Sequence, residues 1–79
     1  MTMEQIDFFL MAVRCDTFLE AAENLHIAQS TLSKQIQKLE TELNLPLFDR
    51  TRRQAVLTPA GKLFRQEASE LSRQYHQML

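Results

Sequence analysis

Polar and cationic side chains recur on one side of a predicted helix in the middle of this chain. These side chains, which hydrogen-bond to base edges or neutralise phosphates, are Gln29, Ser30, Ser33, Lys34, Gln37 and Lys38. The other side of the helix carries an apolar stripe at helical spacing, formed by Leu32, Ile36, Leu39 and Leu43. An isolated polar helix face is usually only a solvated surface, so the interpretation depends on the neighbouring segments.

Charge is distributed unevenly along the chain, although the net charge is only −1. Residues 1–28 hold one basic and five acidic side chains, whereas residues 29–66 hold seven basic and three acidic ones. A polyanion responds to the local field of a surface rather than to the total charge. We therefore expect a basic side that includes the polar helix face, with double-stranded DNA as the partner.

Composition limits the class of protein. A chain of 79 residues is one small domain, and 44% hydrophobic residues with one glycine favour a helical fold. Cys15 is the only cysteine, and His26 and His76 are isolated, so we expect no disulfide, metal or other cofactor in this chain. The longest apolar run, Phe8–Val13, is too short to span a membrane, and the first residues lack signal-peptide features. A cytoplasmic protein with no membrane partner is expected.

Local signals predict four helices. We expect one from Met3, one over Phe18–Leu25, one from Gln29 to Glu42 and one from Pro59 to the last residue. Start signals precede three of them, namely the capping boxes Thr2–Gln5 and Thr17–Glu20 and the pair Thr58–Pro59. Because only the turn around His26 separates the second helix from the third, the two predict a helix-turn-helix.

The segment after the third helix predicts a wing. Asn44 can adopt the left-handed conformation that ends a helix, and Pro46 prevents its continuation. Asp49–Leu57 has a basic middle and an apolar end, which predicts a short β-hairpin with a cationic tip. Beside a helix-turn-helix, Arg52 and Arg53 would enter a narrow minor groove.

The last helix carries a heptad seam formed by Phe64, Ala68, Leu71, Tyr75 and Met78. Part of this seam could serve only to cover the core of the same domain. A seam of this kind is also typical of a pairing helix, so we expect a homodimer.

Four motifs occur in order along the chain. They are Phe18-x-x-Ala21-Ala22-x-x-Leu25, Gln29-x-x-Leu32-Ser33-x-x-Ile36-x-x-Leu39-Glu40, Leu45-Pro46-Leu47-Phe48-x-Arg50 and Leu57-Thr58-Pro59-Ala60-Gly61. With the order of the elements, they resemble the N-terminal DNA-binding domain of LysR-type transcriptional regulators. Ser30 and Lys34 depart from that family's frequent Pro and Arg.

The resemblance implies a mainly α fold, with a winged helix-turn-helix over residues 1–58 and a linker and dimerisation helix over 59–79. It also implies a dimer on inverted-repeat promoter DNA, with helix 29–42 in the major groove and Arg53 at the minor groove. The family's effector-binding domain, which senses a small-molecule co-inducer, is absent from this chain. A fragment of a longer regulator is therefore expected.

We assign the predicted contacts by their chemistry. Base contacts are assigned to Gln29, Ser30, Ser33 and Lys34. Phosphate contacts are assigned to Thr17, Thr31 and Lys38, and wing contacts to Arg52 and Arg53.

Two alternatives remain beside DNA binding. A small dimeric adaptor for proteins would have a third helix that is merely solvated, but it would not explain the arginines at the wing tip. An enzyme would need a base paired with a nucleophile, and no motif provides one, so we expect no catalytic activity.

Overall fold

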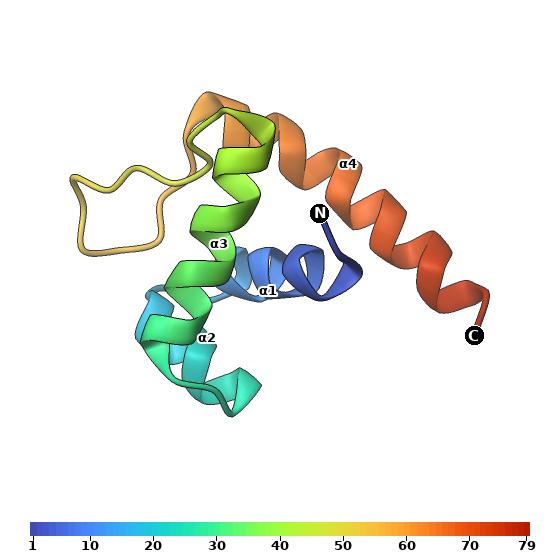
Figure 1. The fold of residues 1–79 in the computed structure, drawn as a ribbon, viewed down its shortest axis with the longest axis horizontal. Helices are drawn as coiled ribbons and strands as arrows, with labels where there is room; N and C mark the ends of the chain where they lie inside the picture. The colour runs from blue at the N-terminus through green and yellow to red at the C-terminus, as the bar shows by residue number, and fades with distance from the viewer.

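The computed structural model describes all 79 residues as four α-helices and their connections. The helices are α1 (Met3–Arg14), α2 (Phe18–Leu25), α3 (Gln29–Leu43) and α4 (Pro59–Gln77). Figure 1 shows α2 and α3 joined by a tight turn, α4 extending to the C-terminus, and the loop between α3 and α4 projecting from the body. The four predicted helices are present, but α3 ends one residue later than expected and α4 ends at Gln77 rather than at the last residue. None of the four combines the length and the apolar character that crossing a membrane requires.

The predicted helix starts use side-chain caps. The Thr2 hydroxyl accepts the Gln5 backbone N–H at 3.0 Å, and Gln5 Oε1 accepts the Thr2 N–H at 3.1 Å, which confirms the first capping box. The Thr17 hydroxyl accepts the Glu20 N–H at 3.1 Å, but Glu20 returns no bond, so only half of the second box forms. These caps satisfy N–H groups that a helix cannot satisfy itself.

Two non-glycine residues with positive φ end the helices of the helix-turn-helix. His26 closes α2 at φ 58°, and Asn44 closes α3 at φ 56°. The prediction that Asn44 takes the left-handed conformation is confirmed, and His26 has a structural role as a turn residue. Both turns set the direction in which the chain leaves its helix.

The core lies where α1 crosses the other three helices. Its twelve buried hydrophobic residues are Ile6, Phe9, Ala12, Cys15, Ala21, Ala22, Leu32, Ile36, Leu39, Leu47, Phe48 and Ala68. The Phe9 ring centroid lies 5.5 Å from that of Phe48 and 5.1 Å from that of Phe64, and Phe18 stacks edge-on against Phe48 at 5.0 Å. One aromatic cluster therefore joins α1, α2, α4 and the start of the projecting loop.

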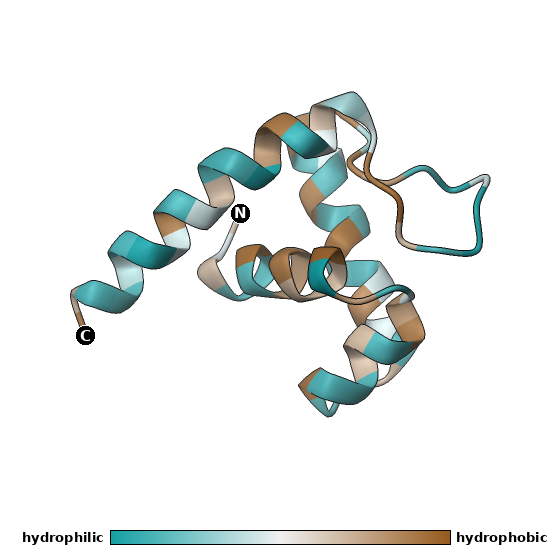
Figure 2. Ribbon diagram, turned by 180° about the vertical axis from the view of Figure 1, so that it is seen from behind, coloured by the Kyte–Doolittle hydropathy of each residue, from teal (hydrophilic) through white to brown (hydrophobic).

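The projecting loop contains no β-strand, which corrects the expected β-hairpin. A single antiparallel bridge joins Phe48 to Leu57, and the Asp49 N–H donates to the Val56 carbonyl at 2.8 Å. Figure 2 shows a hydrophobic base and a largely hydrophilic stretch beyond it. We call residues 49–56 the wing loop.

A hairpin ladder does not extend because backbone donors of the wing loop bond elsewhere. The Thr51 N–H donates to the Asp49 carboxylate at 2.9 Å. The Val56 N–H, which a ladder would pair with the Asp49 carbonyl, donates to the Gln54 carbonyl at 3.0 Å. The Ala55 N–H points away from the ladder and donates to the Asp16 carbonyl at 2.9 Å, before the start of α2. This bond from Ala55 anchors the wing loop to the body, so the loop keeps a defined place without strands.

The residues of the predicted dimer seam on α4 fall into two groups, one packed against the core and one exposed. Phe64 is half-buried against the core of its own chain, and Ala68 is only 2% exposed, so Ala68 has almost no surface to offer a partner. Leu71, Tyr75 and Met78 are exposed, and so is Leu63, at 68%. The outward apolar side of α4 thus keeps three residues of the predicted seam and adds Leu63.

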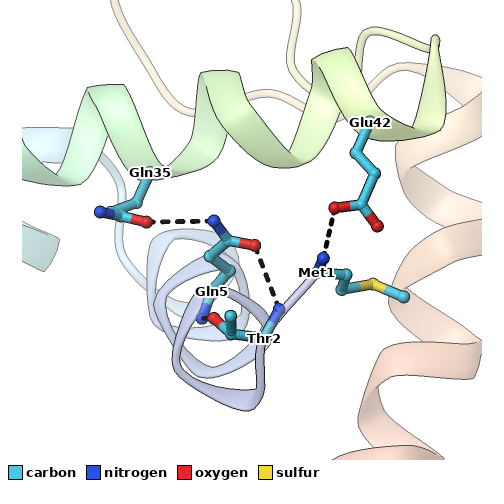
Figure 3. Close-up of polar contacts among 5 residues, drawn as sticks. All are labelled: Met1, Thr2, Gln5, Gln35 and Glu42. Carbon is cyan, nitrogen blue, oxygen red and sulfur yellow. Dashed lines mark hydrogen bonds and ion pairs between the residues drawn. The ribbon is translucent and has the colours of Figure 1, made fainter.

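A polar strap joins the N-terminal residues to α3 (Figure 3). Gln5 Nε2 donates to Gln35 Oε1 at 3.1 Å, and the Met1 ammonium group pairs with the Glu42 carboxylate. At about 3.6 residues per turn, Gln35 and Glu42 lie on the same flank of α3. The strap therefore fixes which side of α3 turns towards α1.

Candidate nucleic-acid interface

The two sides of α3 differ as predicted. Of the predicted apolar stripe, Leu32, Ile36 and Leu39 are fully buried, and Leu43 is partly buried against the core. The polar residues of the opposite side are exposed except for Ser33, which is half-buried; they are Gln29, Ser30, Thr31, Lys34, Gln37 and Lys38. Because the apolar stripe is held by the core, the polar face cannot turn inward. It is free to meet a ligand from solvent.

A groove of about 430 Å³ brings three predicted groups of residues together. Its walls include Thr17 at the start of α2, Gln29 and Ser33 of α3, and Arg52 and Arg53 of the wing loop. These residues come from three separate segments of the chain. The site predicted from scattered motifs is therefore continuous in space on this side of α3.

The remaining predicted residues lie outside this groove. Lys34 and Lys38 line a second, shallower hollow of about 460 Å³ further along α3. Ser30 and Thr31 are exposed and line neither hollow. Together the two hollows follow the polar face of α3, so an elongated ligand could contact both.

Helix α2 points an open N-terminus into the groove. The Thr17 hydroxyl accepts the Glu20 N–H, which leaves the N–H groups of Phe18 and Leu19 without an intrahelical partner. Phe18 and Leu19 both line the groove. Free N–H groups and the positive end of a helix dipole favour an anion such as a phosphate.

The arginines of the wing loop are not equivalent. Arg50 lies 2.7 Å from the Glu40 carboxylate, whereas Arg52 Nε lies 3.5 Å from Asp49 in a pair largely open to water. Arg53 is exposed and forms no ion pair. The charge of Arg53 is therefore the one most available to a ligand.

Asp49 shapes the wing loop. Its carboxylate accepts the Thr51 hydroxyl at 2.6 Å and the Thr51 N–H at 2.9 Å. The pKa of Asp49 lies below its ordinary value, mainly because of the Thr51 hydroxyl, then because of the Thr51 N–H, and less because of Arg52. Asp49 thus remains ionised and closes the turn that presents the arginines.

Two features of the interface were not predicted from the sequence. Gln54 lines the groove beside Arg53, and its position next to that residue was the only signal available. Arg50 also lines the groove, but its charge is compensated by Glu40. The count of basic residues alone cannot distinguish Arg50 from Arg53.

The sequence of this chain matches that of a known family. The model of the family described as "Bacterial regulatory helix-turn-helix protein, lysR family" matches residues 3–62. The chain belongs to the lysR family. The match includes all of α1, α2, α3 and the wing loop, and the first residues of α4.

Curated lysR-family relatives are much longer than this chain. A "Probable RuBisCO transcriptional regulator" of Cyanidioschyzon merolae is 46% identical over 70 residues, covering 89% of this chain and 23% of the relative. The transcriptional regulator BenM of Acinetobacter baylyi is 39% identical over 79 residues, covering 100% of this chain and 26% of BenM. The chain thus spans about a quarter of the length of these relatives.

A solved structure of a lysR-family relative includes DNA. The BenM DNA-binding domain in complex with catB site 1 DNA is 40% identical to this chain, with a TM-score of 0.95. The likeness covers 99% of this chain and 84% of that one. The chain therefore has the mainly helical fold of a lysR-family DNA-binding domain of a transcriptional regulator.

Proposed function

We propose that this lysR-family domain recognises a specific sequence in duplex DNA. Helix α3 enters the major groove and the wing loop approaches the neighbouring minor groove. The observation that carries the proposal is the groove in which the polar face of α3, the open N-terminus of α2 and the unpaired Arg53 meet. The solved complex of the BenM DNA-binding domain with DNA supports DNA binding by this fold.

Base recognition falls to side chains of the first half of α3. Gln29, Ser30, Ser33 and Lys34 contact base edges, since they lie on the polar face of the N-terminal part of the helix, where only Ser33 is half-buried. A well-formed bidentate contact contributes about 1–3 kcal/mol of discrimination between bases. Lys34 approaches guanine as a point charge without the fork of an arginine, so its contribution lies at the lower end of that range.

Phosphate contacts hold the domain in register on the duplex. Thr17, Thr31 and Lys38 surround the base-contacting residues, and Lys38 forms no ion pair. Arg52 and Arg53 extend these contacts to the minor groove, where a narrow groove strengthens the negative potential.

Two copies bind an inverted repeat through pairing of their α4 helices. The exposed apolar residues Leu63, Leu71, Tyr75 and Met78 form the pairing surface. Phe64 and Ala68 support it from inside the domain. A two-fold axis through the paired helices presents both α3 helices to two half-sites. In a whole regulator, an additional domain would bind a small-molecule co-inducer, as the family resemblance implies.

The test begins with a duplex selected by this chain from a random pool. Lys34→Ala should weaken binding to that duplex about 5- to 10-fold, the lower end of the range for a base contact, and weaken binding to random duplex much less. Arg65→Ala is a matched control, because Arg65 is an exposed cation on α4 outside both α3 hollows. Equal losses on the two duplexes would mean that Lys34 contacts only the backbone. Failure to select any sequence would favour the protein adaptor instead.

A further inference from the structure

The Glu40 carboxylate of α3 accepts hydrogen bonds from three donors. Its side chain is only 13% exposed. Oε2 accepts the backbone N–H groups of Leu47 at 2.7 Å and Phe48 at 3.2 Å, and Oε1 accepts Arg50 Nη2 at 2.7 Å. One carboxylate of α3 therefore holds both the backbone and a cationic side chain of the segment that leads into the wing loop.

Arg50 extends this attachment to α2. Its guanidinium carbon lies 5.1 Å from the ring centroid of Phe18 and 6.0 Å from that of Phe48. A planar guanidinium can stack on aromatic rings while it donates to a carboxylate in its plane. Arg50 thus contacts α2, α3 and the base of the wing loop at once.

The contacts of Glu40 complement the polar strap. At about 3.6 residues per turn, Glu40 lies on the flank of α3 opposite Gln35 and Glu42. Gln35 and Glu42 attach one flank to the N-terminal residues, as Figure 3 shows, while Glu40 attaches the other to the wing loop. The polar face of α3 lies between two anchored flanks.

We infer that Glu40 and Arg50 are positioning residues that set the placement of the wing loop relative to α3, and that Arg50 does not contact DNA. This inference rests on the proposed function. The spacing between a major groove and the adjacent minor groove is set by the duplex. Base contacts tolerate little displacement, whereas phosphate contacts form with any sequence. Loss of the attachment therefore reduces discrimination between sequences more than it reduces general affinity.

Two glutamine variants separate positioning from contact, because each removes one wing cation. The measurement is the affinity for the selected and the random duplex at several salt concentrations. Arg53→Gln should reduce the salt slope by about one unit per bound chain, as expected for a lost phosphate contact. Arg50→Gln should leave the slope unchanged and reduce the ratio of selected to random affinity about tenfold.

Glu40→Gln tests the other partner. Its amide oxygen can still accept both backbone N–H groups, but the charge that holds Arg50 is lost. We expect a similar loss of the affinity ratio, a salt slope that does not fall, and no further loss in the double variant with Arg50→Gln. Arg50→Lys keeps a cation for Glu40 without a planar group on Phe18, and should give an intermediate ratio. Only variants that retain their helical structure, as measured by circular dichroism, are compared.

Three results would overturn the inference. They are a salt slope that falls by about one unit in Arg50→Gln, a wild-type affinity ratio in both single variants, and additive losses in the double variant. The proposed function fails in a different way, through a wild-type chain that prefers no sequence or an Arg53→Gln slope equal to that of the wild type.

Discussion

Gly61 of α4 lies directly against the carbonyl oxygen of Leu47. A Cβ on Gly61 would overlap that oxygen and would lie 2.9 Å from a methyl carbon of Leu57. The same oxygen accepts the Thr58 N–H at 3.0 Å. The first turn of α4 thus packs against residues on both sides of the wing loop, and only glycine leaves room for this close approach.

Gly61→Ala should destabilise the domain by about 1–3 kcal/mol, because the added methyl group meets backbone rather than a movable side chain. Alanine is the better helix former by about 1 kcal/mol, so the two effects have opposite signs. Urea unfolding measures the balance, with the exposed Gln66→Ala as a control on the same helix. A Gly61→Ala variant as stable as the wild type would show that the backbone at Leu47 can move to make room for the methyl group.

Thr58 joins the start of α4 to the segment that follows α3 through one hydroxyl. The hydroxyl accepts the Gly61 N–H at 3.0 Å and donates to the Pro46 carbonyl at 2.6 Å. Thr58→Ala loses both bonds and should cost about 1–2 kcal/mol in urea unfolding, whereas Thr58→Ser should retain most of the stability. Equal losses in the two variants would indicate that the methyl group of Thr58, rather than its hydroxyl, is important.

Substitutions at neighbouring positions of α4 should affect either the unfolding free energy of the monomer or its self-association, but not both. Phe64→Ala removes a ring from the aromatic cluster and should cost about 3–5 kcal/mol of unfolding free energy. Leu63→Ala and Leu71→Ala lie on the exposed side and should change the stability of the monomer by less than about 0.5 kcal/mol. Sedimentation equilibrium should show weaker self-association for both leucine variants. Unchanged association would remove this side of α4 from the pairing surface.

The turn at Asp49 in the wing loop should become less stable at acid pH. The pKa of Asp49 is lowered in the folded chain, so its contribution is complete above the unfolded value of about 3.9 and is lost as pH falls through the folded pKa. The Asp49 and Thr51 resonances report this titration in NMR spectra. Thr51→Ala removes the hydroxyl donor and should raise the pKa of Asp49. An Asp49 pKa at its ordinary value in the wild type would contradict the observed hydrogen bonds.

Local sequence was sufficient for most of the secondary structure. Thr2, Thr17 and Thr58 predicted helix starts, and Asn44 predicted a left-handed end, because caps depend on residues a few positions apart. The strands expected in the wing loop do not form, since the Val56 N–H donates to the Gln54 carbonyl rather than to Asp49 and only one antiparallel bridge remains. The residue pattern of 49–57 does not show which of these two bonds forms.

By itself, the sequence determined the four helices, the buried stripe of α3 and the family, since all three depend on the order and spacing of side chains. Only the tertiary structure decided which seam residues of α4 are buried and which wing arginine forms no ion pair. The seam residues Phe64 and Leu71 look equivalent at heptad spacing, but Phe9 covers one of them and solvent covers the other. Likewise, Glu40 compensates Arg50 and leaves Arg53 unpaired. Packing and charge compensation depend on distances through space, and those distances exist only once the helices have assembled around one core.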